Sequence, residues 1–138
     1  MKSFLLIFLI FYPLVWTTAQ DSIHVETPKI ITTLKVGHSI NFDSKSMKFI
    51  GVIEDSRCPT GTDCIWAGEA KALIAFYEDG VLIEKKEFVF GVDAINPNNK
   101  KELFVADPKT IYAYNIQPYP SLEKTIKPSE YSLELIVQ

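Results

Sequence analysis

The stretch GEAKALIAFYEDGVLIEKKEFVF, residues 68–90, decides the fold class of this chain. Its first half, Gly68 to Tyr77, places apolar residues at every second position from Ala70 to Phe76, and these alternate with the polar Glu69 and Lys71. A period of two residues is typical of a β-strand with one buried face. The second half, Val81 to Phe90, is again rich in β-branched and aromatic residues. The stretch therefore predicts two neighbouring antiparallel strands.

The connection between these strands contains a turn signal. Glu78-Asp79-Gly80 predicts a three-residue hairpin loop with Gly80 in the left-handed conformation. In that register Lys71 lies opposite Glu87, and Phe76 lies opposite Leu82.

Short β-rich runs of this kind recur along the rest of the chain, and no window of ten or more residues shows a helical stripe. Eight such runs suit two packed sheets, so we expect an all-β, single-domain, two-sheet sandwich, immunoglobulin-like or related, with about seven or eight strands. The charged block Glu84 to Glu87 is typical of an exposed edge strand. The predicted strands are Lys29–Leu34, Ser39–Phe42, Met47–Asp55, Gly68–Tyr77, Val81–Phe90, Glu102–Val105, Thr110–Ile116 and Tyr131–Val137.

Residues 1–19 have the pattern of a secretory signal peptide. Lys2 is followed by an apolar run from Phe4 to Trp16 and by small residues up to Ala19. This run is shorter than the roughly 20 residues that span a bilayer. We therefore expect cleavage on one side of Gln20 and a secreted or periplasmic β domain, residues 20–138, without stable membrane insertion.

The cysteine content agrees with export. Cys58 and Cys64 are the two cysteines of the chain, and five residues separate them. In an oxidising compartment such a pair predicts a disulfide. Loop-closure entropy for so short a loop stabilises the fold by roughly 2 to 2.5 kcal/mol. A redox-active pair is disfavoured because such cysteines are usually separated by two residues. A zinc site is disfavoured because the two histidines, His24 and His38, lie far from the cysteines in the sequence.

The residues around these cysteines form the most distinctive segment. Asp-Ser-Arg-Cys-Pro, residues 55–59, is followed by the second cysteine and then by Ile-Trp-Ala-Gly, residues 65–68. This pattern resembles the signature of a family of small exported bacterial proteins of uncharacterised function. The resemblance implies a secreted β domain and carries no activity with it. Some members of that family resemble lipoproteins, and this chain differs from them in having no cysteine near the cleavage region.

Two interpretations of this segment are open. As a structural brace, Asp55 would accept hydrogen bonds from loop amides, and Arg57 would pair with Asp55 or stack on Trp66. As a binding site, the clipped loop would present Arg57 and Trp66 to a partner. Binding requires an exposed Trp66 or Arg57, whereas a brace buries both. A calcium site formed by Asp55, Asp63 and Glu69 is a third and weaker possibility.

Tyrosines mark two further features. Tyr112 and Tyr114 share one face of a predicted strand, where they either pack or offer a second binding surface. Tyr131 follows Pro128 at the start of the last strand, which resembles the tyrosine corner of immunoglobulin-like sandwiches, in which the phenol bonds to upstream backbone.

Composition and missing motifs narrow the function. The 138-residue chain has a formal net charge of −3, one arginine and no basic block, which disfavours nucleic acid as a partner. His24 and His38 are its two histidines, and it contains no motif of a serine hydrolase, zinc protease or phosphate-binding loop. We therefore predict a protein that is not an enzyme and needs no cofactor or metal.

The predicted function is that of an exported binding or interaction module that uses the disulfide loop, residues 57–66, on a protein or an envelope component. The candidate contact residues are Asp55, Arg57, Trp66, Tyr112 and Tyr114. Two alternatives are an inhibitor that wedges this loop into an extracellular or periplasmic hydrolase, and a purely structural cell-envelope protein.

Overall fold

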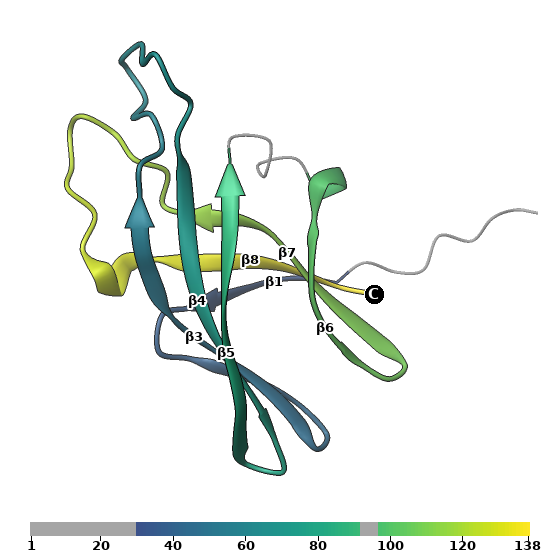
Figure 1. The fold of residues 1–138 in the computed structure, drawn as a ribbon. Helices are drawn as coiled ribbons and strands as arrows, with labels where there is room; N and C mark the ends of the chain where they lie inside the picture. Colours follow the sequence, from purple (N-terminus) through teal and green to yellow (C-terminus); the bar gives the residue numbers. More distant parts are fainter. Residues whose placement is uncertain (1–29, 92–96) are drawn as a thin grey trace, which may run out of the picture.

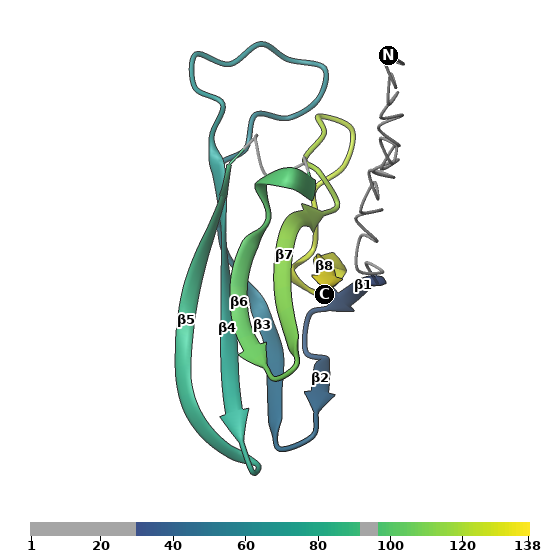
Figure 2. The same cartoon turned by 90° about the vertical axis from the view of Figure 1, so that its right-hand side faces the viewer.

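Eight strands form two antiparallel four-stranded sheets that pack face to face (Figures 1 and 2). The computed structural model describes residues 30–91 and 97–138. The elements are β1 (Ile30–Lys35), β2 (Ser39–Phe42), β3 (Lys45–Asp55), β4 (Glu69–Glu78), β5 (Val81–Gly91), η2 (Pro97–Asn99), β6 (Lys101–Ala106), β7 (Lys109–Gln117), η3 (Pro128–Glu130) and β8 (Ser132–Val137). The predicted two-sheet sandwich is confirmed. The eight predicted strands are found, with ends within two residues of those expected. Lys29, the first residue of the first predicted strand, and the proposed signal peptide lie outside the described residues.

The strand order explains how the sheets are connected. Sheet A has the order β1-β8-β7-β6 and sheet B the order β2-β3-β4-β5. Consecutive strands are mostly hydrogen-bonded neighbours, so each sheet is largely a meander. An immunoglobulin domain instead divides its strands as ABED and CFG, so this fold is a related sandwich with simpler connectivity. The strands of the two sheets cross one another in Figure 1, as in orthogonal packing.

The core lies between the sheets and follows the predicted alternation. On β4, Ala70, Ala72 and Ile74 are fully buried, and Phe76 is 9% exposed. Sheet A contributes inward-facing side chains from β7 and β8 in the same way. The largest fully buried side chains are Phe49, Phe90, Met47, Ile74, Ile111, Ile116, Leu133, Leu135 and Ile136.

The predicted register of the β4–β5 hairpin is wrong. Asp79 and Gly80 alone form the turn, with φ of 49° and 78°, and Glu78 pairs with Val81. Two positive φ values are typical of a two-residue type I′ turn, whose twist matches that of the strands. Further from the turn the register shifts, so that Phe76 lies opposite Glu84 and Ile83 is the extra residue of a bulge. Sequence pattern alone did not reveal this bulge.

The prediction that β5 is an edge strand is confirmed, because within residues 30–91 and 97–138 β5 pairs with β4 alone. Glu84 and Lys86 lie opposite the inward-facing Phe76 and Ile74, and so belong to the inner face of sheet B. Inward-pointing charges on an edge oppose pairing with another sheet. In Figure 1 the lower part of the β4–β5 hairpin extends beyond sheet A, which leaves this part of the inner face open.

Candidate functional site: a disulfide-pinned loop on a buried arginine

The loop of residues 56–68 connects β3 to β4 and projects from one end of the sandwich (Figure 1). A second connection, residues 118–127, lies beside it. The amide of Thr60 donates to the carbonyl of Pro120 at 2.9 Å, and Thr60 forms a parallel bridge with Ser121. The two loops therefore form one continuous end of the molecule.

The predicted disulfide closes the projecting loop. Cys58 and Cys64 are bonded, with their Cα atoms 5.9 Å apart. The amide of Cys58 also donates to the carbonyl of Ala67 at 2.9 Å, so the loop is tied at its base as well as across its middle. A loop fixed in two ways loses less conformational entropy when it binds.

Arg57 anchors this loop between the sheets. Its side chain forms a two-pronged ion pair with Asp55, with Nε to Oδ1 at 2.8 Å and Nη2 to Oδ2 at 2.6 Å. Its other bonds cross to the end of β7, where Nη1 donates to the carbonyl of Ile116 at 2.7 Å and Nη2 to that of Pro118 at 3.1 Å. The guanidinium also lies 4.9 Å from the ring centroid of Tyr119. Arg57 thus joins sheet B to sheet A.

Tyr131 completes the surroundings of Asp55. Its hydroxyl donates to Asp55 Oδ2 at 3.0 Å, so this phenol bonds to a side chain and not to upstream backbone as the tyrosine-corner resemblance implied. Burial opposes ionisation of Asp55, but the hydrogen bonds and charge of Arg57, together with the Tyr131 hydroxyl, outweigh it and lower the pKa of Asp55. Burial and then the Asp55 carboxylate raise the pKa of Tyr131 to about 12. Asp55 and Arg57 are therefore held as an ionised pair.

Gly68 permits the close return of the loop at the start of β4. Its φ is +73°, and a Cβ added there would lie 1.8 Å from the carbonyl oxygen of Ser56. The backbones of residues 56 and 68–69 approach each other so closely that the Ser56 amide donates to the Glu69 carbonyl at 2.8 Å.

The loop carries an exposed apolar pair, Ile65 and Trp66, which is named the tip. Ile65 is 93% exposed and Trp66 is 81% exposed, and Leu122 of the adjacent loop is 67% exposed. Arg57, by contrast, is 4% exposed. The loop therefore has features of both the brace and the binding site. Arg57 is buried and braces the base, whereas Ile65 and Trp66 face solvent. Ile65 and Leu122 were not among the predicted contact residues, although the adjacent Ile65 and Trp66 in a polar loop were a usable signal.

The other predicted site residues are placed elsewhere. Tyr112 is half-buried, with the Lys100 ammonium 4.1 Å from its ring centroid. Tyr114 is 8% exposed, and its burial, followed by the nearby Glu134, raises its pKa. Asn115 donates to Glu134 at 2.9 Å across the β7–β8 ladder. Burial and neighbours thus favour packing over a second tyrosine surface.

Metal ligation finds no support in residues 30–91 and 97–138, where no three His, Cys, Asp or Glu side chains gather to hold an ion. Asp55, one of the three residues of the calcium alternative, is instead paired with Arg57. His38 is exposed and its Nδ1 donates to the carbonyl of Val36 at 3.2 Å, while His24 lies outside the described residues. In the same described ranges, no helix is long and apolar enough to cross a membrane.

Comparison with known proteins adds no relative: no protein-family profile, curated protein or solved structure matches the chain.

Proposed function

We propose that this chain is an exported, non-enzymatic binding module that inserts Ile65 and Trp66 into an apolar pocket of a partner protein. The observation that carries this proposal is the near-complete exposure of two adjacent large apolar side chains on a loop pinned by a disulfide. Exposed apolar side chains gathered in this way are typical of interaction sites.

The rigidity of the loop supports binding rather than adventitious exposure. Arg57 fixes the base, and the Cys58–Cys64 disulfide fixes the middle, so Trp66 is presented with little entropy left to lose. Tryptophan is among the residues that most often dominate the binding energy of an interface. Ile65 and Trp66 are adjacent on a projecting loop, and a projecting apolar pair is complementary to a concave apolar pocket.

Export is part of the proposal. The signal-like residues 1–19 and the Cys58–Cys64 disulfide both support an extracytoplasmic compartment. The partner is accordingly a protein of the envelope or the surrounding medium.

The test compares three forms of the full chain produced by secretion. These are the wild type, a tip variant Ile65→Ala/Trp66→Ala, and a control variant Val81→Ala/Leu82→Ala, which removes exposed apolar side chains from the opposite end of sheet B. Each immobilised protein is incubated with envelope and culture-medium extracts. The expected partner is retained by the wild type and the control and lost by the tip variant.

The captured protein is then purified and its dissociation constant measured. We expect a loss of affinity of about 30-fold or more for the tip variant, the cost of removing a dominant tryptophan. Equal recovery and equal affinity for all three proteins contradict the proposal. Flotation with phospholipid vesicles provides a separate arm, and vesicle binding that depends on Trp66, without a protein partner, also overturns it.

A narrower second candidate is an inhibitor of an extracellular or periplasmic hydrolase. The projection of residues 56–68 beyond the sandwich, visible in Figure 1, favours a loop that enters a cleft. Inhibition of a panel of secreted peptidases and glycosidases tests it. Inhibition by the wild type that the Ile65→Ala/Trp66→Ala variant lacks supports the inhibitor, and absence of inhibition across the panel leaves the non-inhibitory binding module.

A further inference from the structure

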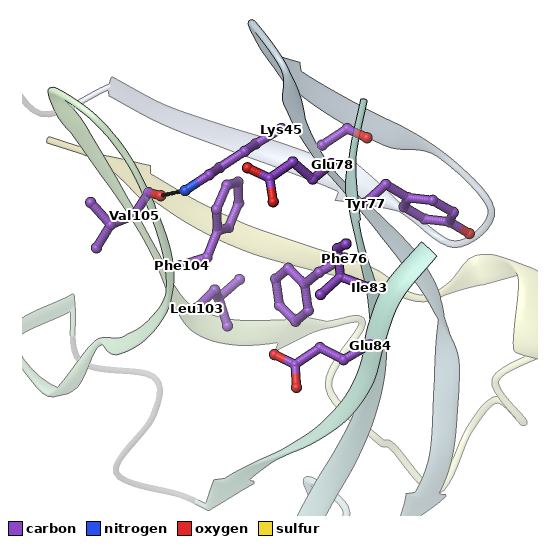
Figure 3. Close-up of a pocket in the computed structure, with 10 residues that line it drawn as sticks. Lys45, Phe76, Tyr77, Glu78, Ile83, Glu84, Leu103, Phe104 and Val105 are labelled. Carbon is purple, nitrogen blue, oxygen red and sulfur yellow. Dashed lines mark hydrogen bonds between the residues drawn. The ribbon is translucent and has the colours of Figure 1, made fainter. Parts of the chain in front are cut away.

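A second site lies at the other end of the molecule, where the β4–β5 hairpin of sheet B separates from β6 of sheet A. A cavity of about 360 Å³ opens here between the two edge strands β5 and β6. This volume is in the range of small-ligand pockets. Figure 3 shows the apolar side chains Phe76, Ile83, Leu103, Phe104 and Val105 around it.

The aromatic floor of the cavity is preformed. Phe104 packs edge to face against Phe76 at 5.6 Å and against Phe42 at 5.7 Å between ring centroids, and Phe76 contacts Phe88 at 6.2 Å in the same manner. Such contacts fix ring orientations. A ligand therefore meets a surface that needs little rearrangement.

The β5 bulge supplies the exposed wall. Ile83 is the extra residue between the pairs Phe76–Glu84 and Tyr77–Leu82, and it lines the cavity while remaining 61% exposed. A bulge re-aims a side chain and interrupts the regular edge. This geometry favours a small ligand that rests on Ile83 over a partner strand that extends the sheet.

Charge at the mouth selects the kind of ligand. The Lys45 ammonium donates to the Val105 carbonyl at 3.1 Å, across from β3 to β6. Glu78 and Glu84 flank the apolar side chains in Figure 3, and their carboxylates make no ion pair or hydrogen bond within residues 30–91 and 97–138. Lys45 lies opposite Glu78 in the β3–β4 ladder, so the charged side chains Lys45, Glu78 and Glu84 give the mouth one net negative charge. A negatively charged mouth beside phenylalanine rings is a favourable environment for an organic cation.

From this arrangement we infer that the cavity binds a small apolar molecule that carries a protonated amine. The apolar part contacts Ile83, Phe104 and Val105, and the ammonium lies between Glu78 and Glu84. This site is separate from the disulfide loop, which lies at the opposite end of the sandwich in Figure 1.

The test uses three probes that share one phenyl ring and differ in the head group: phenethylamine, phenethyl alcohol and hydrocinnamate. Binding to the full chain is followed by NMR shifts of the cavity residues. We expect millimolar dissociation constants, as suits ligands of so few atoms, with the amine bound roughly five-fold more tightly than the alcohol and the acid bound most weakly.

Three variants separate the contributions. Glu78→Gln/Glu84→Gln should abolish the preference for the amine, whereas the control Glu87→Gln should retain it, because Glu87 lies opposite Leu73 on the other face of the sheet. Ile83→Ser should weaken all three probes at least three-fold. An unchanged unfolding midpoint establishes that each variant is folded.

A capped peptide that contains Phe-Lys distinguishes the source of the ligand. Tighter binding of the peptide assigns the amine to a polypeptide segment, and tighter binding of phenethylamine assigns it to a free small molecule; both results support the ligand chemistry. The inference is overturned if no probe gives saturable shifts at the cavity, if the acid binds as well as the amine, or if Ile83→Ser changes nothing.

Discussion

Arg57 and Trp66 stand on either side of one disulfide, yet Arg57 is 4% exposed and Trp66 is 81% exposed. Arg57 is held by Asp55 and by carbonyls at the end of β7, while Trp66 lies on the projecting loop. The same short segment therefore contains a structural anchor and a solvent-exposed tip, and mutations should separate their effects.

Removing the anchor should destabilise the fold strongly. Arg57→Ala leaves the Asp55 carboxylate and two carbonyls without their buried donor, and we expect a loss of about 3 to 5 kcal/mol in the free energy of unfolding. Trp66→Ala should change it by less than about 0.5 kcal/mol. Urea unfolding measures both. Similar losses for the two variants would show that the loop is not divided into anchor and tip.

Gly68 should tolerate no side chain. Gly68→Ala places a methyl group against the Ser56 carbonyl at a positive φ, so we expect a loss of about 3 kcal/mol or more. The control is Gly61→Ala, in the same loop with φ +88° and no atom within 4 Å of the added Cβ, which should cost about 1 kcal/mol. Equal unfolding midpoints for the two variants would refute the close approach of residues 56 and 68.

The disulfide should contribute modestly. Cys58→Ser/Cys64→Ser should lower the free energy of unfolding by about 2 kcal/mol, the entropy of so short a loop. The loop keeps its bonds from Cys58 to Ala67 and from Thr60 to Pro120, so cooperative unfolding should persist. Thermal denaturation with and without reductant provides the measurement, and complete unfolding on reduction would contradict it.

The Asp55–Arg57 ion pair should make the free energy of unfolding depend on pH in the acidic range. The folded-state pKa of Asp55 is lowered by Arg57 and Tyr131 despite burial, so its stabilisation is complete above the unfolded value of about 3.9. It is lost as the pH falls through the lowered pKa, because the unfolded chain binds the proton first. Below pH about 4, the free energy of unfolding of wild type should fall more steeply than that of Asp55→Asn. Parallel curves would be inconsistent with the pair.

Tyr131 should have its effect at alkaline pH. Its pKa is raised to about 12 in the folded protein by burial and by Asp55, against about 10 in the unfolded chain. Between these values the unfolded chain releases the proton first, so stability should decrease as pH rises from about 10 to 12. Tyr131→Phe should reduce this decrease, and the part that remains is expected from Tyr114, whose pKa is also raised by burial. In a titration followed by phenolate absorbance, the variant should lack the tyrosine that ionises at the highest pH. An unchanged titration would contradict the raised pKa of Tyr131.

The sequence predicted elements better than registers. Alternation on β4 identified Ala70 to Phe76 as a buried face, and the charged block Glu84 to Glu87 identified an edge. The hairpin register was wrong because Asp79 also adopts a positive φ and because Ile83 forms a bulge. A bulge depends on how β5 fits against β4 and around the core, and short-range pattern does not contain that information.

The sequence predicted the part of the candidate site that depends on residues close together in the chain. The cysteine spacing and the residue types of segment 54–69 identified the loop, since short-range chain connectivity is enough to place a disulfide. Only the tertiary structure showed which distant residues bond to the base of the loop, namely Ile116 and Pro118 to Arg57 and Tyr131 to Asp55.

The sequence by itself determined a two-sheet β fold, because burial of one face imposes a period of two on strands such as β4. It also determined the Cys58–Cys64 clip, since five residues lie between the thiols. The tertiary structure alone decided that Arg57 is buried and Trp66 exposed. That difference depends on Ile116 and Pro118, which are about 60 residues further along the chain and accept bonds from Arg57 only after the two sheets have packed.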